Sequence, residues 1–358
     1  MTKKIVIIGA GPAGLLAAVY FKQHNIDVTL IGPEPKHTNS MVYALHPSHI
    51  KWLHKHLVEV KTKPVSQMIL QPLNEQLTLT SAYSAHDSLC ETVYHNDLLH
   101  ALKQARRKLD ITWIKGVPSD LNLNSVTINQ SGTISRHKAT HILACDGTNS
   151  WTRSQTPISS SQFNYQQIAH TAIVTHTLKN HDAFQRFDSS GTLAILPTSN
   201  PHQSAVIYSC RNHTPAQKKK HELNLALSQL TFLGNIIVSQ DHTTTPLISQ
   251  LSHPFHYRNI YLIGSSGHTM HPLAGIGFNL AITDIKIACE HILANLPSSH
   301  YSIKRKRSHQ KAHWITHTIA NTANLEQFLP LIGLSKHIIS LPHTQKRILK
   351  HIDNICLY

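Results

Sequence analysis

Residues 4–21, KIVIIGAGPAGLLAAVYF, decide the fold of this chain. Lys4 to Ile8 is an apolar stretch that predicts a short buried strand, and the glycines that follow it have the spacing GxGxxG. The next run, up to Phe21, is apolar and predicts a helix packed in the core. A strand that leads through a tight glycine turn into a helix is typical of a nucleotide-binding unit.

Each position of the glycine turn has a distinct physical role. Gly9 permits the tight turn, Gly11 lets a pyrophosphate approach the backbone, and Gly14 lets the helix pack against the strand. Pro12 and Ala13 open the helix, where backbone N–H groups point toward a bound phosphate. We therefore expect these five residues to bind the pyrophosphate of a dinucleotide.

The second strand, Val28 to Ile31, is expected to end on an acidic residue that accepts hydrogen bonds from the adenosine ribose. Gly32 occupies that place, and the nearest carboxylate is Glu34, which lies between two prolines. Two interpretations stay open. Either Glu34 reaches back to the ribose, or the ribose is held less well than in other proteins of this kind.

A second candidate segment follows the buried strand that ends at Cys145 and begins with Asp146 and Gly147. Ligands bind at the carboxyl ends of strands in α/β sheets, so Asp146 can accept from a ribose or ribityl hydroxyl. Arg153, a few residues later, can pair with a phosphate or fix the loop. The alternative is an Asx-type turn that Asp146 caps.

A third candidate segment is NIYLIGSSGHTMHPLAGIGFNLAITD, residues 259–284. It predicts a strand, a small-residue turn at 264–267, a rigid His271-Pro272 step and a glycine-flanked loop that opens a helix at Phe278. Such a corner directs several backbone N–H groups toward one point, which suits a phosphate or an electron-rich ring. The alternative is an ordinary strand–loop–helix corner.

Composition narrows the classes of protein that fit. The 358 residues suffice for two domains or one large α/β domain with an insertion, and five cysteines without CxxC spacing fit reduced thiols in the cytosol. The net charge of +15 attracts nucleic acid, phosphorylated ligands or an anionic membrane surface, unless it reflects only a basic proteome. Because no nucleic-acid signature is present, a membrane surface is the favoured partner.

The chain contains 30 histidines, which raises the question of a metal site. His309, His313 and His317 are spaced to share one helical face. No cysteine or carboxylate in the sequence completes a ligand set around them, so we expect no metal.

Three segments now stand in one order: GAGPAG at 9–14, CDGTNSWTR at 145–153 and IGSSGHTMHPLAGIGFNLAITD at 263–284. This arrangement resembles the group A FAD-dependent aromatic monooxygenases. The third segment, with HPLAG and GFNL, is most similar to the ubiquinone-biosynthesis hydroxylases that act on polyprenylated phenols. YALHPSHIKWL at 43–53 and AFQRF at 183–187 are also similar to that family.

The resemblance implies FAD as the cofactor, with NAD(P)H as the reductant and O2 and a polyprenyl phenol as substrates. It implies that hydroxylation proceeds through a flavin C4a-hydroperoxide, so that no side chain is itself catalytic. His271 and Pro272 would position the ring. The cofactor contacts that it implies on the third segment are Gly264, Ser265, Pro272, Gly275, Ile276, Gly277, Phe278 and Asn279.

The implied fold is α/β: a Rossmann-like FAD-binding domain with a parallel sheet and helices, an antiparallel-sheet substrate domain and C-terminal helices. Short alternating runs between residues 160 and 256 predict the antiparallel sheet. The basic run at 304–307 is expected to spread around its helix as a solvated or membrane-facing surface. The apolar stretch 328–341 is expected to pack on the domain as helix or to enter a lipid headgroup layer. The expected boundaries are 1–63, 93–158 and 257–298 for the FAD-binding domain, 64–92 and 159–256 for the substrate domain, and 299–358 for the C-terminal segment.

Four positions differ from the family pattern that the resemblance implies: Gly32 for the ribose acid, Met41 for arginine, Ser265 for aspartate or asparagine, and Ile276 for glutamine. Three hypotheses follow. The first is a polyprenyl-phenol hydroxylase, cytoplasmic and peripheral on the inner membrane face. The second is a non-catalytic homologue that acts as a scaffold in a quinone-biosynthesis complex. The third is a flavin hydroxylase of a soluble aromatic compound.

Overall fold

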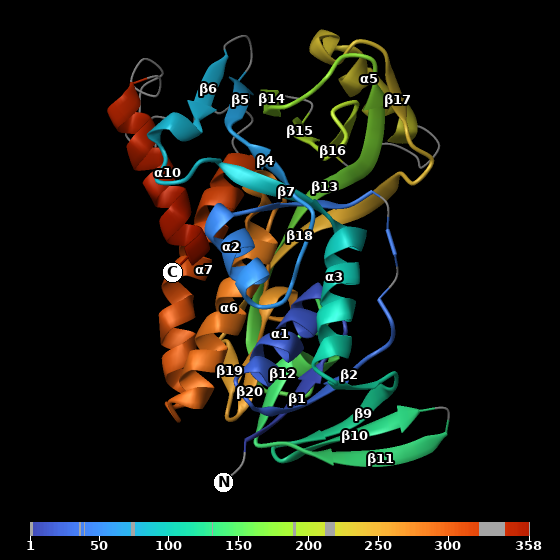
Figure 1. Ribbon diagram of the computed structural model, residues 1–358, viewed down its shortest axis with the longest axis vertical. Helices are drawn as coiled ribbons and strands as arrows, with labels where there is room; N and C mark the ends of the chain where they lie inside the picture. The colour runs from blue at the N-terminus through green and yellow to red at the C-terminus, as the bar shows by residue number, and fades with distance from the viewer. Residues whose placement is uncertain are drawn as a thin grey trace.

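The computed structural model describes residues 3–35, 37–38, 40–72, 76–130, 132–188, 191–211, 219–321 and 341–357. Two large sheets organise these residues, one of six strands and one of nine. Figure 1 shows the six-stranded sheet in the lower half of the molecule and the other above it. Two helices near the C-terminus run along one side of both halves.

The six-stranded sheet has the order β19-β20-β12-β1-β2-β8. All its pairings are parallel except that of β19 with β20 at one edge. This is the parallel sheet that the family resemblance implied. Its strands are β1 (Lys4–Ile8), β2 (Asp27–Ile31), β8 (Thr112–Ile114), β12 (His141–Ala144), β19 (His256–Tyr257) and β20 (Ile260–Leu262).

Both faces of this sheet are covered by other elements. Alternate residues of β1 point to opposite faces, and both sets are buried. Ile5 and Ile7 belong to the core beneath three helices, α1 (Pro12–Gln23), α3 (His95–Lys108) and α6 (Ile276–Leu293). Val6 and Ile8 instead pack against a small three-stranded sheet. That sheet contains β9 (Val117–Asn122), β10 (Ser125–Gln130) and β11 (Thr133–Lys138).

The nine-stranded sheet is mainly antiparallel, as the alternating runs predicted, with β5 and β14 as a parallel pair. Helix α5 (Lys219–Ser228) packs against one face of it. The other face looks onto the cavity described below. Its strands are β5 (Gln67–Pro72), β6 (Leu77–Thr80), β13 (Ser159–His176), β14 (Ala183–Asp188), β15 (Gly191–Pro197), β16 (Gln203–Arg211), β17 (Ile236–Val238), β18 (Thr243–His253) and β21 (His268–Thr269).

Short elements join the two halves. A third sheet contains β3 (Val42–Leu45), β4 (Lys63–Val65) and β7 (Cys90–Tyr94), and α2 (Pro47–Lys55) follows β3 directly. Because β3 contacts both α6 and the loop before it, this sheet lies next to the third candidate segment. The remaining short helices are η1 (Ser81–Tyr83), α4 (Trp151–Ser154), η3 (Thr231–Leu233), η4 (Gly264–Ser266) and η5 (Leu273–Gly275).

The C-terminal region is helical, as predicted, in the part that the structure describes. Helix α7 (Ser298–Asn321) packs on α6, and α10 (Pro342–Leu357) packs on both α6 and α7. Residues 328–340 of the apolar stretch lie outside the described residues, so its packing stays a prediction. Within the described ranges, no helix combines the length and the hydropathy that a membrane span requires. The domain boundaries also stay a prediction.

Candidate functional site

The glycine turn after β1 has the geometry that its sequence requires. Gly9 has a φ of +105°, and a Cβ there would lie 2.3 Å from the carbonyl oxygen of Cys145. A Cβ on Gly14 would lie 1.8 Å from the oxygen of Gly9. A Cβ on Gly11 would instead meet no atom within 4 Å. Gly9 and Gly14 are therefore needed for packing, whereas Gly11 faces open space at the start of α1, where a pyrophosphate would approach.

The end of β2 differs from a usual ribose site. Glu34 pairs through its two carboxylate oxygens with Lys115 at 2.8 Å and Lys103 at 3.0 Å. The hydrogen bonds from these lysines lower the pKa of Glu34 to about 2, and the bond from Lys115 has the largest effect. Gly32 lies against the glycine turn, since a Cβ there would come within 3.0 Å of the Ala10 nitrogen. A ribose contact from Glu34 would have to compete with the lysine pairs.

Asp146 is used by its own loop. Its carboxylate accepts hydrogen bonds from the Ser150 hydroxyl at 2.6 Å and from the Thr152 backbone N–H and hydroxyl, both at 2.8 Å. This is the capped turn that the sequence left open as an alternative. Gly147 beside it has a φ of +82°, and a Cβ there would meet no atom within 4 Å. The loop is thus braced from within, and a cofactor contact by Asp146 stays a prediction.

Arg153 connects the second candidate segment to the third. Its guanidinium donates to the carbonyl oxygens of Ser266 at 2.5 Å and Thr148 at 2.9 Å. Of the two roles that the sequence allowed for Arg153, the structure therefore shows the fixing of the loop. Ser265 is exposed at this corner, whereas the adjacent Ser266 is buried and donates to the carbonyl oxygen of Ala144 at 2.6 Å.

Asp284 is the buried centre of the third segment. It accepts from the Gly264 N–H at 2.9 Å and from His268 Nε2 at 3.2 Å, and it pairs with Arg305 Nε at 2.6 Å. His309 Nε2 lies 3.3 Å from the same carboxylate. Burial alone would raise the pKa of Asp284, but His309 and Arg305 together hold it well below its usual range. The turn after β20 is thus fixed to α6 and α7.

The sequence interpretation of α7 was wrong at one position. Residues 304–307 were expected to spread around the helix as a solvated or membrane-facing surface, yet the Arg305 side chain is fully buried. The sequence spacing could have indicated this burial, because Tyr301, Arg305, His309 and Ala312 lie three or four residues apart and so share one helical face. All four are buried in the structure. These four residues form the inner face of α7.

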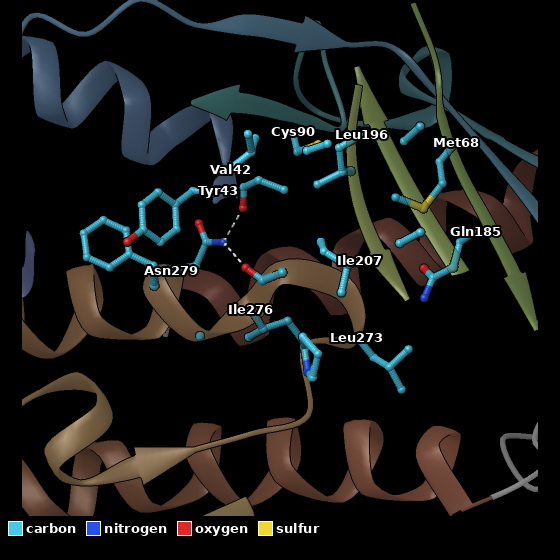
Figure 2. A pocket seen from close by; sticks show the side chains of 18 of the residues that line it. Val42, Tyr43, Met68, Cys90, Gln185, Leu196, Ile207, Leu273, Ile276 and Asn279 are labelled. Atoms are coloured by element: carbon cyan, nitrogen blue, oxygen red, sulfur yellow. Dashed lines mark hydrogen bonds between the residues drawn. The ribbon is translucent and has the colours of Figure 1, made fainter. Parts of the chain in front are cut away.

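Asn279 joins the start of α6 to the strand that precedes α2. Its Oδ1 accepts from the His46 backbone N–H at 2.8 Å and faces His49 Nδ1 at 3.0 Å. Its Nδ2 donates to the carbonyl oxygens of Ala44 at 2.9 Å and Gly275 at 3.1 Å, the two contacts drawn in Figure 2. All four contacts of the Asn279 amide are therefore within the protein. Its role is to hold residues 272–279, which comprise the loop and the first turn of α6 and are called the 272–279 loop below, against β3.

A cavity of about 350 Å³ lies between this loop, the nine-stranded sheet, β3 and α10. Its lining is mainly apolar, and Figure 2 shows the sheet and loop side chains around the space. Met41 lines it at the β3 side, and Gln185 is a polar group on the sheet side. Other lining side chains include Val42, Met68, Leu196, Ile207, Leu273, Ile276, Leu349 and Ile352.

The predicted ring-binding residues come together along one wall of this cavity. Pro272, Gly275, Ile276, Gly277, Phe278 and Asn279 all line it, and so does His271. His271 faces Gln167 Oε1 at 3.0 Å, and burial lowers its pKa to about 4, so the ring is neutral near pH 7. Gly264 and Ser265 are not among the lining residues of this cavity.

Residues 94–310, more than half of the chain, match the FAD binding domain family. The chain belongs to this FAD-binding family. Residues 3–86 also match the pyridine nucleotide-disulphide oxidoreductase family, which covers the glycine turn and the strand after it. FAD fits the residues present, because Gly11 faces open space beside the start of α1 and the 272–279 loop borders a cavity.

Similar proteins agree with this assignment. Ubiquinone hydroxylase UbiM of Neisseria meningitidis is 26% identical over 334 residues, covering 81% of this chain and 68% of that protein. Ubiquinone biosynthesis monooxygenase COQ6 of Caenorhabditis elegans is 30% identical over 189 residues, covering 41% of this chain and 42% of its own length. The second match thus spans less than half of each protein.

Solved structures show the same fold. The p-nitrophenol 4-monooxygenase PnpA of Pseudomonas putida has a TM-score of 0.83 at 15% identity, covering 99% of this chain and 98% of that one. Klebsiella pneumoniae HpxO, complexed with FAD and uric acid, has a TM-score of 0.73 at 15% identity, covering 99% and 97%. The family match shows an FAD-binding chain, as the three segments predicted, and the two relatives are named a hydroxylase and a monooxygenase.

Proposed function

We propose that this FAD-binding protein hydroxylates the aromatic ring of a polyprenylated phenol in ubiquinone biosynthesis, with O2 as co-substrate. The observation that carries the proposal is the apolar cavity of about 350 Å³ whose wall is the 272–279 loop. When bound, FAD would supply the electron transfer and the oxygen activation that ring hydroxylation requires. The relatives named ubiquinone hydroxylase and COQ6 support the choice of substrate class.

The protein's own contribution is binding, orientation and the exclusion of water. The turn from Gly9 to Gly14 would hold the pyrophosphate, and the 272–279 loop would lie along the flavin ring. Helix α6 begins at Ile276 and has no side-chain cap at its N-terminus. Its partial positive charge therefore points toward the cavity wall and would stabilise negative charge on a reduced ring.

The cavity lining favours a substrate with a large apolar part. Side chains such as Leu196, Ile207 and Leu273 offer contact area, and few polar groups compete with them. Gln185, Thr171 and Thr192 are polar residues that can hydrogen-bond a phenolic or methoxy oxygen. This lining favours a polyprenyl phenol over a small soluble aromatic.

A membrane surface is the proposed place of action. Helices α7 and α10, which run along one side of the molecule in Figure 1, carry exposed basic residues, and α7 also carries two exposed apolar side chains, Trp314 and Ile303. Helix α10 also lines the cavity from inside, through Leu349 and Ile352. An anionic bilayer would attract this side and deliver an apolar substrate close to the cavity. The basic residues are Lys304, Lys306, Arg307, Lys346, Arg347 and Lys350.

The test combines three measurements on the purified chain. FAD titration should give saturable binding, NADH or NADPH should bleach the bound flavin without oxygen, and a short-chain polyprenyl phenol should gain one oxygen atom by mass spectrometry. Protein that binds FAD but never hydroxylates the phenol would support the scaffold hypothesis, which the engaged Glu34 and Asp146 carboxylates also motivate. Failure to bind FAD at any concentration would refute the proposal.

The membrane part has its own test. Co-sedimentation with vesicles that contain phosphatidylserine should exceed that with phosphatidylcholine vesicles, and should weaken at high salt because the attraction is electrostatic. Replacing Lys346, Arg347 and Lys350 with glutamine should lower it. Equal sedimentation with both vesicle types would contradict the membrane surface.

A further inference from the structure

A cluster of potential metal ligands lies on the face of the nine-stranded sheet that α5 covers. A ring nitrogen of His170 on β13, the Cys210 thiol on β16 and a carboxylate oxygen of Glu222 on α5 lie within 4.8 Å of one another. His170 and Cys210 are buried, with 0% and 4% of their surfaces exposed. Three chain segments that are distant in sequence thus bring a nitrogen, a sulfur and an oxygen to one point.

We propose that His170, Cys210 and Glu222 bind a divalent transition metal, with zinc as the best match. Imidazole, thiolate and carboxylate are the donors that zinc takes in proteins. Cys210 Sγ lies 3.7 Å from Glu222 Oε2, so the two groups can share one ion. Zinc takes both groups in their deprotonated forms.

His242 supports the ligand role of His170. His170 Nδ1 lies 2.9 Å from His242 Nε2, and the two rings are stacked with an angle of 12° between their planes. A histidine that binds a metal through one nitrogen usually has its other nitrogen fixed by a hydrogen bond. His170 would therefore use Nε2 for the ion, with His242 setting its tautomer and orientation.

Two other groups of possible ligands are poorer candidates. Asp284, between His268 and His309, already has the Arg305 guanidinium at 2.6 Å, and this fixed cation would repel a metal ion. His46 and Asp353, with His86 nearby, belong to the wall of the cavity already described, and this group contains no thiol. The His170 cluster is the one that combines a thiol with imidazole and carboxylate donors among these three groups.

The position of the cluster indicates what an ion would do. Because alternate residues of a strand point to opposite faces, the neighbours of the ligands line the cavity on the other side of the sheet. These neighbours are Ala169, Thr171 and Ser209. A bound ion would therefore clip α5 to the sheet and stiffen the cavity wall from behind. Metal binding here does not depend on the flavin site, so its test is independent of the proposed hydroxylation.

The experiment uses the full chain, purified, treated with a chelator and then titrated with Zn²⁺ or Co²⁺ alone. We expect one tightly bound ion per chain, a thiolate-to-Co²⁺ charge-transfer band, and protection of Cys210 from alkylation when zinc is present. Cys210→Ser should abolish the band and the protection. His242→Ala should weaken zinc binding by about 10- to 100-fold, which is typical for loss of a group that orients a ligand.

Cys289→Ser is the matched control, because Cys289 is a buried cysteine on α6 that lies in a different core cluster. This variant should bind zinc like the wild type. If Cys210→Ser does not fold, Glu222→Gln serves in its place, since Glu222 is only partly buried. The proposal is overturned if wild type and Cys210→Ser bind metal equally, as adventitious binding to other histidines would predict, or if zinc leaves Cys210 reactive.

Discussion

Arg305 Nε lies 2.6 Å from Asp284 Oδ1, and both side chains are buried. Asp284 also accepts the backbone N–H of Gly264, so one carboxylate connects α6, α7 and the turn after β20. A polar contact between two helices thereby fixes part of the candidate flavin site. Burying the two charges costs free energy because both lose their hydration. Removing one partner costs more stability, because the other charge would then be buried without an opposite charge beside it.

Arg305→Ala should therefore destabilise the protein by about 3–5 kcal/mol, the usual cost of removing one member of a buried ion pair. The free energy of unfolding in urea measures this. Lys306→Ala is the control, because Lys306 is the exposed neighbour on the same helix and should change stability by no more than about 0.5 kcal/mol. If the two substitutions lower the free energy of unfolding equally, the Arg305–Asp284 pair does not stabilise the protein more than an exposed residue of the same helix.

Stability should fall as the pH is lowered from about 6.5 toward 4. Burial lowers the pKa of His49 to about 3 and that of His271 and His309 to about 4, against the ordinary value of 6.5. In this window the unfolded chain binds protons at these histidines and the folded chain does not, so protonation favours unfolding. Each histidine contributes up to about 1.4 kcal/mol per pH unit.

Urea unfolding at several pH values between 7 and 4.5 measures the slope. His271→Gln should reduce it by up to one proton's contribution, because glutamine does not titrate. A free energy of unfolding that stays constant over this range would contradict the assignment of neutral, buried histidines.

Two glycines of the first turn should separate cofactor binding from folding. Gly11→Ala adds a Cβ to open space at a φ of −69°, which any residue adopts, so stability should stay within about 0.5 kcal/mol. The same Cβ would stand where a pyrophosphate approaches, so the Kd for FAD should rise at least about tenfold, or about 1.4 kcal/mol.

Gly14→Ala should instead lower the stability of the protein. Its Cβ would lie 1.8 Å from the Gly9 oxygen, so α1 must shift and the protein should lose about 1–3 kcal/mol or more of stability. FAD titration and thermal melting on both variants check the pair. If Gly11→Ala keeps the wild-type Kd for FAD, the turn does not approach a pyrophosphate.

The cavity should accept less substrate when a wall residue is enlarged. Ile207→Trp places a bulky ring in the cavity, so the KM for a polyprenyl phenol should rise about tenfold or more, as loss of about 1.4 kcal/mol of binding implies. The Kd for FAD should stay unchanged because Ile207 lies on the sheet and not on the 272–279 loop. Steady-state kinetics and FAD titration separate the two effects.

Ile237→Trp is the control for this variant, since Ile237 is 72% exposed on β17 and lies outside the cavity lining. It should leave KM unchanged. An unchanged KM in Ile207→Trp would place the substrate elsewhere in the protein.

Local patterns predicted the parts of the fold that depend on neighbouring residues. The strand, glycine turn and helix at 4–21 are one continuous unit, and the alternating runs of the nine-stranded sheet have a period that the sequence displays directly. The family class followed because three such local segments occur in a fixed order. Each of these features can be read without knowing which distant residues will come into contact.

Side-chain roles were harder to predict because they depend on distant partners. Asp146 could serve a ligand or its own loop, and only the positions of Ser150 and Thr152 show the second arrangement. Ile276 differs from the glutamine of the family pattern, and the structure explains it by packing against Leu280 and Ala312, which places it in an apolar cluster. Similarly, the charge run at 304–307 does not reveal which basic residue turns inward.

Helix α10 has a consequence for how this protein can diversify. It supplies Leu349, Ile352 and Cys356 to the cavity, whereas the glycine turn at 9–14 lies in a different part of the fold. Under the proposed function, mutations on the inner face of α10 would alter which ring or side chain is accepted and would leave the glycine turn unchanged. Selection for a new substrate would then have a short helical segment on which to act, separate from the residues proposed to hold the cofactor.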